Sequence, residues 1–217
     1  TAAFDEMKKQ SRTVVEREHY KTELVPELLI PGEFNKDNAR AAKAGVKKLV
    51  PDISDEVIDT ALAAYKGTWR RFEHKGTLPS GAELYDDYAH HPTAIRKTIE
   101  AARQKFPDKK IAVFFHPHLY SRTRDLFKDF ASALASIDEV YILPVYAARE
   151  PHDPTATHEA LAEATNTQGG HARGISGFEE TTAKLLTLGP DTVAFTMGAG
   201  DVYKAGEKAL LPGGRQV

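Results

Sequence analysis

The chain has 217 residues, enough for one large or two modest globular domains with a buried core. Hydrophobic residues make up 41% and charged residues 28%, which excludes a mainly disordered chain, and a formal charge of -2 gives no electrostatic reason to expect nucleic acid as a partner. There is no cysteine for a disulfide or a thiolate metal site, and no apolar run approaches the ~20 residues that span a bilayer.

The N-terminal segment predicts little regular structure. Residues 1–6 lack the basic and apolar regions of a signal peptide and begin without Met, so we expect a truncated, cytoplasmic protein. Short β-rich patches at 12–16 and 24–30 favour edge strands or a hairpin.

Two helices are predicted next. Asn35 or Asp37 is expected to cap a helix that runs to about Val50, and Ser54 opens a second helix that Gly67 ends. Two helices and a hairpin bury too little apolar surface to close a core by themselves. Residues 1–66 are therefore interpreted as the tail of a larger domain.

From Gly67 onward, strands and helices alternate. The strands are predicted over 82–85, 111–115, 140–143, 171–175 and 193–197. The helices are predicted over 93–106, 124–137, 157–165, 179–188 and 202–210, followed by a frayed tail over 211–217. An uninterrupted apolar run such as 111–115 is typical of strands buried on both faces. The pattern predicts an α/β fold, an open and mainly parallel sheet with helices on both faces.

Polar segments follow four of these strands. They are 86–92, 116–122, 146–150 and 198–201. Open α/β sheets bind ligands outside the carboxyl ends of their strands, so these segments are the candidate site. Their polar crowding, with histidines, acids and arginines, is what a site at one edge of a sheet requires.

Each signal also has a simpler interpretation. His116 and His118, at alternate positions, could bind zinc or iron with Asp87, but no further pair completes a ligand set. Arg122 and Arg124 open a helix, where the dipole disfavours cations, which indicates an anionic ligand unless they form surface salt bridges. The glycines at 198–200 could cradle a phosphate or permit close packing, and no Lys-Ser/Thr follows them as in a P-loop.

Taken together, the motifs resemble those of the Mur ligase family, in order and spacing, over residues 24–210. The segments that carry the resemblance are PGEFNKDNA at 31–39, RRFE at 70–73, YDDYAHHPT at 85–93, PHLYSRTRDLF at 117–127 and TMGAGD at 196–201.

The resemblance implies an ATP- and Mg²⁺-dependent ligase that joins L-alanine to UDP-N-acetylmuramate through an acyl phosphate, with no nucleic-acid or membrane partner. It implies that residues 1–66 are the remnant of a central ATP-binding domain and residues 67–217 a Rossmann-like, amino-acid-binding C-terminal domain. Because the 217 residues contain no Gly-Lys-Thr phosphate loop and no magnesium ligands of the central sheet, the chain by itself is expected to be inactive.

The resemblance also implies a nucleotide site. Asn35 and Asn38 are expected to contact the adenine, Arg71 the phosphates and Asp87 the ribose. Tyr88 is expected beside the nucleotide or the acyl phosphate.

On the substrate side, the resemblance places His90 beside the nucleotide or the acyl phosphate. His118 and Arg122 are expected to meet the muramate end and the incoming alanine, with Tyr120 and Arg149 nearby. The catalytic roles fall to Arg71, His90, His118 and Arg122.

Two positions depart from the family pattern. Phe34 stands where His is usual, and Leu119 stands where Arg is usual, so either Arg149 compensates or the substrate preference differs. Three alternatives stay open: a family member that attaches a recycled tripeptide to the same sugar, a non-catalytic binding domain, and a histidine-based metallohydrolase.

Overall fold

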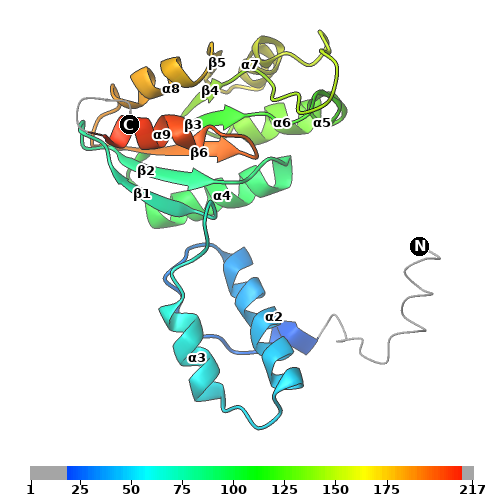
Figure 1. Cartoon of the computed structure of the whole chain (residues 1–217), viewed down its shortest axis with the longest axis vertical. Helices are drawn as coiled ribbons and strands as arrows, with labels where there is room; N and C mark the ends of the chain where they lie inside the picture. The colour runs from blue at the N-terminus through cyan, green and yellow to red at the C-terminus, as the bar shows by residue number, and fades with distance from the viewer. Residues whose placement is uncertain (1–18, 212–217) are drawn as a thin grey trace, which may run out of the picture. The chain divides into compact units, whose positions relative to one another are not determined.

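The computed structural model describes residues 19–211, which form two compact units that divide between Lys66 and Gly67 (Figure 1). The strand predicted at 12–16 and the predicted tail from 212 onward lie outside the described residues. Within 19–211, no helix has the length and apolar character needed to cross a bilayer.

The first unit contains a 3-10 turn and two helices. They are η1 (His19–Thr22), α2 (Glu33–Leu49) and α3 (Asp55–Ala64). Lys43 on α2 is 1% exposed, and its ammonium binds Asp59 at 2.7 Å and Asp55 at 3.3 Å. It also donates to the carbonyl oxygen of Leu24 at 3.0 Å. Desolvating an ammonium without partners is costly, so this cluster joins the two helices and the segment before them.

The helix boundaries of the first unit correct part of the prediction. Helix α2 begins after Gly32, whose φ of 99° suits glycine, rather than at a cap on Asn35 or Asp37. The Asn35 amide instead donates to the carbonyl oxygen of Pro31 at 2.7 Å. Ser54 caps α3 as predicted, and α3 ends at Ala64, before Gly67.

The strand predicted at 24–30 is wrong, because this segment has no regular structure. A strand needs a neighbour to pair with, and the described part of this unit contains only helical elements. Leu24 and Leu29 are 85% and 59% exposed, so the apolar pattern of the segment has no core to meet.

The second unit is built on a six-stranded sheet. Its strands are β1 (Glu73–Thr77), β2 (Glu83–Asp87), β3 (Lys110–His116), β4 (Glu139–Ile142), β5 (Ala172–Gly174) and β6 (Thr192–Gly198). Their spatial order is β1-β2-β6-β3-β4-β5. Every pairing is parallel except that of β1 with β2. This confirms the predicted open, mainly parallel sheet, and adds β1, an antiparallel edge strand that was not predicted.

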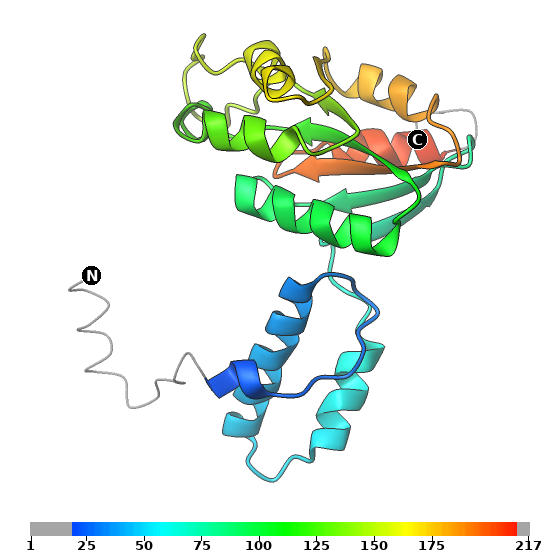
Figure 2. The ribbon, with the colours of Figure 1, turned by 180° about the vertical axis from the view of Figure 1, so that it is seen from behind.

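Helices cover both faces of the sheet. They are α4 (Pro92–Lys105), α5 (Tyr120–Asp125), α6 (Phe127–Leu134), α7 (His158–Thr167), α8 (Phe178–Leu185) and α9 (Tyr203–Leu210). Helices α4, α6 and α7 pack side by side on one face, and α8 and α9 on the other, as Figures 1 and 2 show from opposite sides. This two-sided cover explains why strand residues on both faces are apolar.

One predicted helix is two helices. The apolar pattern over 124–137 is divided at Leu126, whose φ of -109° and ψ of 19° end α5 and precede α6. Helix α5 begins at Tyr120, earlier than predicted, so only residues 117–119 separate β3 from the helix. The carboxyl end of β3 therefore leads almost directly into a helix that carries several of the candidate residues.

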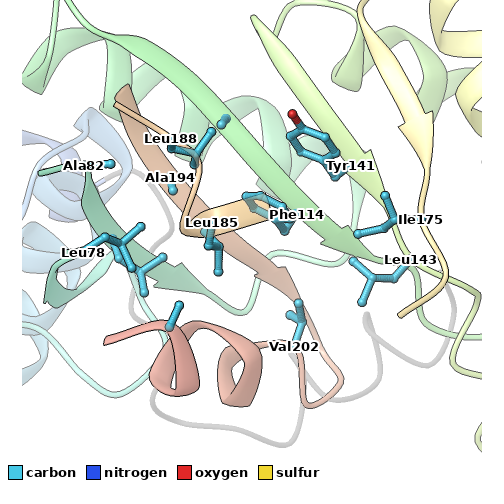
Figure 3. Close-up of a cluster of buried hydrophobic side chains, with 13 residues drawn as sticks. Leu78, Ala82, Phe114, Tyr141, Leu143, Ile175, Leu185, Leu188, Ala194 and Val202 are labelled. Carbon is cyan, nitrogen blue, oxygen red and sulfur yellow. The ribbon is translucent and has the colours of Figure 1, made fainter. Parts of the chain in front are cut away.

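The core lies on both sides of the central strands. On the α8 and α9 side, Phe114 and Tyr141 stack with their rings 4.7 Å apart above Leu185 and Val202 (Figure 3). On the other side, Phe115 packs against Phe130 of α6 at 5.5 Å. Each such fully buried side chain stabilises the fold by about 1.5–3 kcal/mol, which makes the sheet a rigid base for the segments at its edge.

Candidate active site at the carboxyl edge of the sheet

The site is positioned by strand β6, which lies between β2 and β3. The carboxyl ends of the three strands are level, since Asp87 pairs with Met197 and His116 with Gly198. The connections after β2 and β3 lead to helices on one face of the sheet, and the connection after β6 leads to α9 on the opposite face. Diverging connections of this kind mark the place where open α/β sheets bind ligands.

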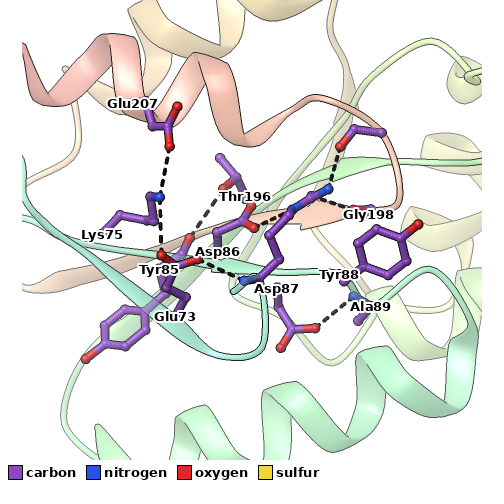
Figure 4. A network of polar contacts seen from close by, with 12 residues as sticks. Glu73, Lys75, Tyr85, Asp86, Asp87, Tyr88, Ala89, Thr196, Gly198 and Glu207 are labelled. Atoms are coloured by element: carbon purple, nitrogen blue, oxygen red, sulfur yellow. Dashed lines mark hydrogen bonds and ion pairs between the residues drawn. The ribbon is translucent and has the colours of Figure 1, made fainter. Parts of the chain in front are cut away.

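A buried arginine ties this edge together. Arg70 is 3% exposed, and its guanidinium donates to Asp86 at 2.7 Å and to the carbonyl oxygens of Gly198 at 2.6 Å and Gly200 at 2.9 Å. The Thr196 hydroxyl donates to the other Asp86 oxygen at 2.6 Å (Figure 4). Burial raises the pKa of Asp86, and the hydrogen bonds from Arg70 and Thr196 oppose that shift.

Asp87, which was expected to contact the ribose, accepts hydrogen bonds from two backbone N–H groups in this structure. Its two oxygens accept the N–H groups of Phe72 and Ala89, each at 2.8 Å, and the residue is 5% exposed. Burial raises the pKa of Asp87. Both oxygens are already engaged, so a ribose hydroxyl would have to use a remaining lone pair. The bond from Phe72, at a φ of 49°, fixes a turn that L-residues rarely adopt.

Two guanidinium groups lie over one tyrosine ring. The Arg70 and Arg71 Cζ atoms are 5.1 Å and 5.4 Å from the ring centroid of Tyr88. Arg71 is exposed and, within residues 19–211, forms no ion pair, whereas Arg70 is fully engaged. This turn therefore buries one arginine and leaves the other, Arg71, exposed with no ion-pair partner among the described residues.

The structure brings together the three residues expected at the substrate. The rings of His90 and His118 are 6.4 Å apart, and the Arg122 Nη1 atom lies 3.3 Å from His118 Nδ1. Burial lowers the pKa of both histidines, and the positive charge of Arg122 lowers them further. His118 also stacks on Tyr146 at 5.5 Å, in the loop after β4.

Leu119 starts α5 in a strained conformation. Its φ of 73° and ψ of 129° are rare for a residue with a side chain. The Leu119 N–H donates to the carbonyl oxygen of Tyr146 at 2.9 Å, and its carbonyl oxygen accepts from the hydroxyl and N–H of Thr123. These bonds hold the turn that presents His118, although the side chain differs from the family's usual arginine.

Glu150 fixes the first turn of α5. It accepts from the Ser121 N–H at 2.9 Å and from the Ser121 hydroxyl at 2.5 Å, and these bonds lower the pKa of Glu150. Neighbouring Arg149 is exposed and has no hydrogen bond or ion pair in the described part of the chain. Tyr120 packs edge-on against His152 at 5.4 Å. Sequence reasoning selected Arg149 and Tyr120 here but missed Glu150.

Arg124 forms surface salt bridges, the simpler of the two interpretations given above. It is exposed, and Nη1 binds Asp153 at 2.9 Å while Nε binds Asp125 at 3.1 Å. Both Arg122 and Arg124 lie in the last turn of α5, so the prediction that they open a helix is wrong and the helix dipole does not disfavour them there. Surface ion pairs account for Arg124, and Arg122 carries the anion-binding hypothesis through its contact with His118.

His116, considered above only as a metal ligand, underlies the site as a buried packing residue. It is 7% exposed, its Nδ1 atom has no hydrogen-bond partner, and burial lowers its pKa to about 4. The residues opposite it must be glycine: a Cβ at Gly198 would lie 2.4 Å from the His116 carbonyl oxygen, and one at Gly200 would lie 2.5 Å from Nδ1. The glycines therefore serve close packing of the β6 loop onto β3, the second interpretation given above.

The metal-site alternative gains no ligand set. Among residues 19–211, no three His, Cys, Asp or Glu side chains form a group that could hold a metal ion. Asp87, the third ligand considered with His116 and His118, uses both oxygens on backbone N–H groups.

The residues expected at the adenine lie in the first unit. Asn38 is exposed on α2, Asn35 is partly buried with its amide on Pro31, and Phe34 is partly buried beside it. An exposed asparagine amide at the start of a helix can bind the edge of a base, and Asn35 retains its carbonyl oxygen for this.

Comparison with known proteins agrees with these motifs. A family model described as Mur ligase, glutamate ligase domain, matches residues 70–200. The chain is 41% identical over 185 residues to UDP-N-acetylmuramate–L-alanine ligase of Desulfitobacterium hafniense, covering 84% of this chain and 40% of that protein. It is 40% identical over 185 residues to the enzyme of the same name from Clostridium acetobutylicum, covering 85% and 40%.

A solved structure agrees as well. The crystal structure of UDP-N-acetylmuramate–alanine ligase from Thermotoga maritima superposes with a TM-score of 0.69 at 28% identity, covering 84% of this chain and 38% of that one. The murein peptide ligase of Psychrobacter arcticus, at 21% identity and a TM-score of 0.59, shares the fold. The chain spans about 40% of the length of the relatives it matches. Matched over more than half its length, this chain belongs to the Mur ligase family.

Proposed function

We propose that this chain is the C-terminal part of an ATP-dependent ligase that joins L-alanine to UDP-N-acetylmuramate. One observation carries the proposal: Arg71, His90, His118 and Arg122 lie at the ligand-binding edge of the sheet in a chain 41% identical to a ligase of that name. In this proposal, residues 1–66 are the end of the ATP-binding domain, and 67–217 are the domain that receives the amino acid.

The chemistry explains why cations gather here. A carboxylate does not react with an amine until one oxygen becomes a good leaving group, and ATP, when bound, supplies the phosphoryl group that does this. Both the nucleotide and the activated acid are anionic, and guanidinium forks match their oxygens. Within residues 19–211, no three His, Cys, Asp or Glu side chains form a metal-binding group, and the proposal names no Mg²⁺ ligand among them.

On the nucleotide side, Arg71 is the phosphate ligand, held over the Tyr88 ring. Asn35 and Asn38 contact the adenine, and Asp87 contacts the ribose through a free lone pair. The fit of Arg71 to an anion is direct, because it is exposed and has no ion-pair partner within 19–211.

On the substrate side, His118 and Arg122 bind the muramate end and the alanine carboxylate. Tyr120 and Arg149 border them from α5 and from the loop after β4. Substrates of this class, a nucleotide sugar and ATP, imply a cytoplasmic location.

The test is ATP-dependent phosphate release by the full-length parent protein, with UDP-N-acetylmuramate and single amino acids in turn. Release that depends on L-alanine supports the proposal. Phosphate release only with a tripeptide would assign the function of a murein-peptide ligase instead. If none of the tested acceptors gives phosphate release, the proposal is wrong. The 217-residue chain by itself should not hydrolyse ATP, and tight ATP binding by it in a calorimetric titration would contradict the weak affinity we expect.

A pair of charge-matched variants locates the nucleotide side. R71M should raise the KM for ATP at least about 10-fold, because a charge-assisted bond to phosphate is lost. R173M removes the same charge from exposed β5 and should leave this KM unchanged. Equal effects of the two variants would show that Arg71 does not meet the phosphates.

A further inference from the structure

We infer that His90 and His118 are held in opposite neutral tautomers, so that Nε2 of His90 accepts a proton while Nε2 of His118 donates a hydrogen bond. The inference deepens the proposed function, on which its catalytic part rests. Its structural part stands on the hydrogen bonds alone.

The tautomer of His90 follows from its partner. Nδ1 lies 2.9 Å from the carbonyl oxygen of Tyr88, and a carbonyl oxygen can only accept. Nδ1 must therefore carry the proton, which leaves a lone pair on Nε2 of the neutral ring. Within residues 19–211, that Nε2 forms no hydrogen bond, so its lone pair is open to a ligand.

His118 is constrained in the opposite sense. Its Nδ1 lies 3.3 Å from Nη1 of Arg122, and a guanidinium can only donate. Nδ1 must therefore be bare, and the proton of the neutral ring sits on Nε2. In the described part of the chain, that N–H has no acceptor either, so it is open to an oxygen of the ligand.

The surroundings keep both rings neutral. Burial lowers the pKa of His90, and the hydrogen bond to the Tyr88 carbonyl oxygen opposes this shift. The charges of Arg122, Arg71 and His91 lower the pKa further. Burial also lowers the pKa of His118, aided by Arg122 and His90 and opposed by Glu150. Cations outnumber the single carboxylate that faces the pair, so a neutral base persists here at neutral pH.

These two roles fit the amide-forming step. The alanine nitrogen, as free amine, attacks the acyl phosphate carbon, so that a C–N bond forms and the nitrogen becomes positively charged. His90 Nε2 takes one proton from this nitrogen, and His118 Nε2–H donates to the oxygen that gains negative charge. The C–O bond to phosphate then breaks, inorganic phosphate leaves with the electron pair, and the His90 imidazolium returns its proton to water.

The first test reads the tautomers in the 217-residue chain. Long-range ¹H–¹⁵N correlation spectra at neutral pH distinguish protonated from bare ring nitrogens, and H90N and H118Q assign the two rings among nine histidines. We expect a bare Nε2 on His90 and a bare Nδ1 on His118. Exposed His91, whose Nδ1 accepts from the Thr93 N–H at 3.3 Å, gives a reference for the second pattern. A protonated Nε2 on His90, or the same tautomer on both rings, would overturn the inference whatever the activity.

The second test uses paired variants in the full-length parent. Gln places an amide near Nε2 and can donate but cannot take a proton, so H118Q should retain most of kcat while H90Q loses about 100-fold or more. H118N, which cannot reach that position, should lose about 100-fold as well. H171N, at an exposed histidine next to β5 and outside the candidate site, should leave kcat unchanged.

The pH profile separates proton transfer from support of the fold. In the native protein, kcat should fall at acidic pH as His90 becomes protonated, and this limb should disappear in the residual activity of H90Q. If H90Q keeps kcat and the acid limb, His90 is not the proton acceptor even where its tautomer is as inferred. If the native parent shows no L-alanine-dependent turnover, the proposed function fails, while the spectra still decide the tautomers.

Discussion

The Nη2 atom of Arg70 lies 2.6 Å from the carbonyl oxygen of Gly198, a residue 128 positions further along the chain. The same guanidinium binds Asp86 at the end of β2 and the carbonyl oxygen of Gly200. One buried side chain thus joins the segment before β1, strand β2 and the loop after β6. Its neighbour Arg71, which we propose as the phosphate ligand, follows directly in this anchored segment, so the buried arginine positions the exposed one.

Replacing Arg70 by Met should destabilise the protein strongly. The variant leaves Asp86, which is 0% exposed, without its cation and removes three hydrogen bonds. We expect the free energy of unfolding to fall by about 3–5 kcal/mol in urea denaturation followed by circular dichroism. R71M, at the exposed neighbour, should change it by less than about 0.5 kcal/mol. Similar losses for the two variants would show that the buried network does not anchor the fold.

Gly198 should tolerate alanine far less than Gly177 does. Their φ values are similar, 135° and 149°, so an added Cβ strains both backbones alike. At Gly198 the Cβ would lie 2.4 Å from the His116 carbonyl oxygen, whereas at Gly177 nothing lies within 4 Å. Comparing the melting temperatures of G198A and G177A isolates that contact. The free energy of unfolding should fall by at least about 2 kcal/mol more in G198A than in G177A, and equal losses would contradict the close packing.

Acid should weaken the fold through His116. Its pKa in the folded state is about 4, against 6.5 for the exposed side chain, so unfolding takes up a proton between these values. Stability is therefore complete above pH 6.5 and falls as pH drops toward 4, by up to about 3 kcal/mol. Urea denaturation at pH 7 and pH 4.5 measures the loss. H116F has no ring nitrogen to protonate, so its stability should fall less between pH 7 and pH 4.5. The same pH dependence in H116F and the native protein would show that His116 does not cause the loss.

Leu119 should be better replaced by Gly than by Val. Its φ of 73° disfavours any Cβ and a branched one most, while glycine adopts it without strain. We expect L119V to be about 2 kcal/mol less stable than L119G in chemical denaturation. Equal stabilities would indicate that the turn relaxes, and the presentation of His118 would then tolerate change at this position.

The central sheet could be predicted because its strands are unusually apolar. The runs at 111–115 and 193–197 lie within β3 and β6, and all ten of their residues are buried between two layers of helices. Strand β1 was missed because EHKGT has no apolar alternation: it is an edge strand with a register shift between His74 and Gly76. Among residues 19–211, β2 is the only strand that pairs with it, so pairing rather than burial makes it a strand. At 24–30 the apolar pattern predicted a strand that does not form, because the pattern alone cannot supply a neighbouring strand to pair with.

The candidate site could be predicted only as far as the motifs reached. They named Arg71, His90, His118 and Arg122, and the structure places the last three together. Arg70 stood in the same motif, but its role depends on carbonyl oxygens that approach only in the folded chain. The roles of Glu150 and His116 were not predicted for the same reason, because contacts between distant segments leave no local pattern.

The position of β6 has a consequence for how the chain is made. The sheet consists of two halves, β1 with β2 and β3 with β4 and β5, and the strand that joins them is the last to be synthesised. Until residues 192–198 leave the ribosome, each half has an unpaired inner edge strand, which can pair with another chain and promote aggregation. A nascent chain that stalls before this point therefore carries two incomplete sheets, and a single late insertion completes both the fold and the edge on which the candidate site is built.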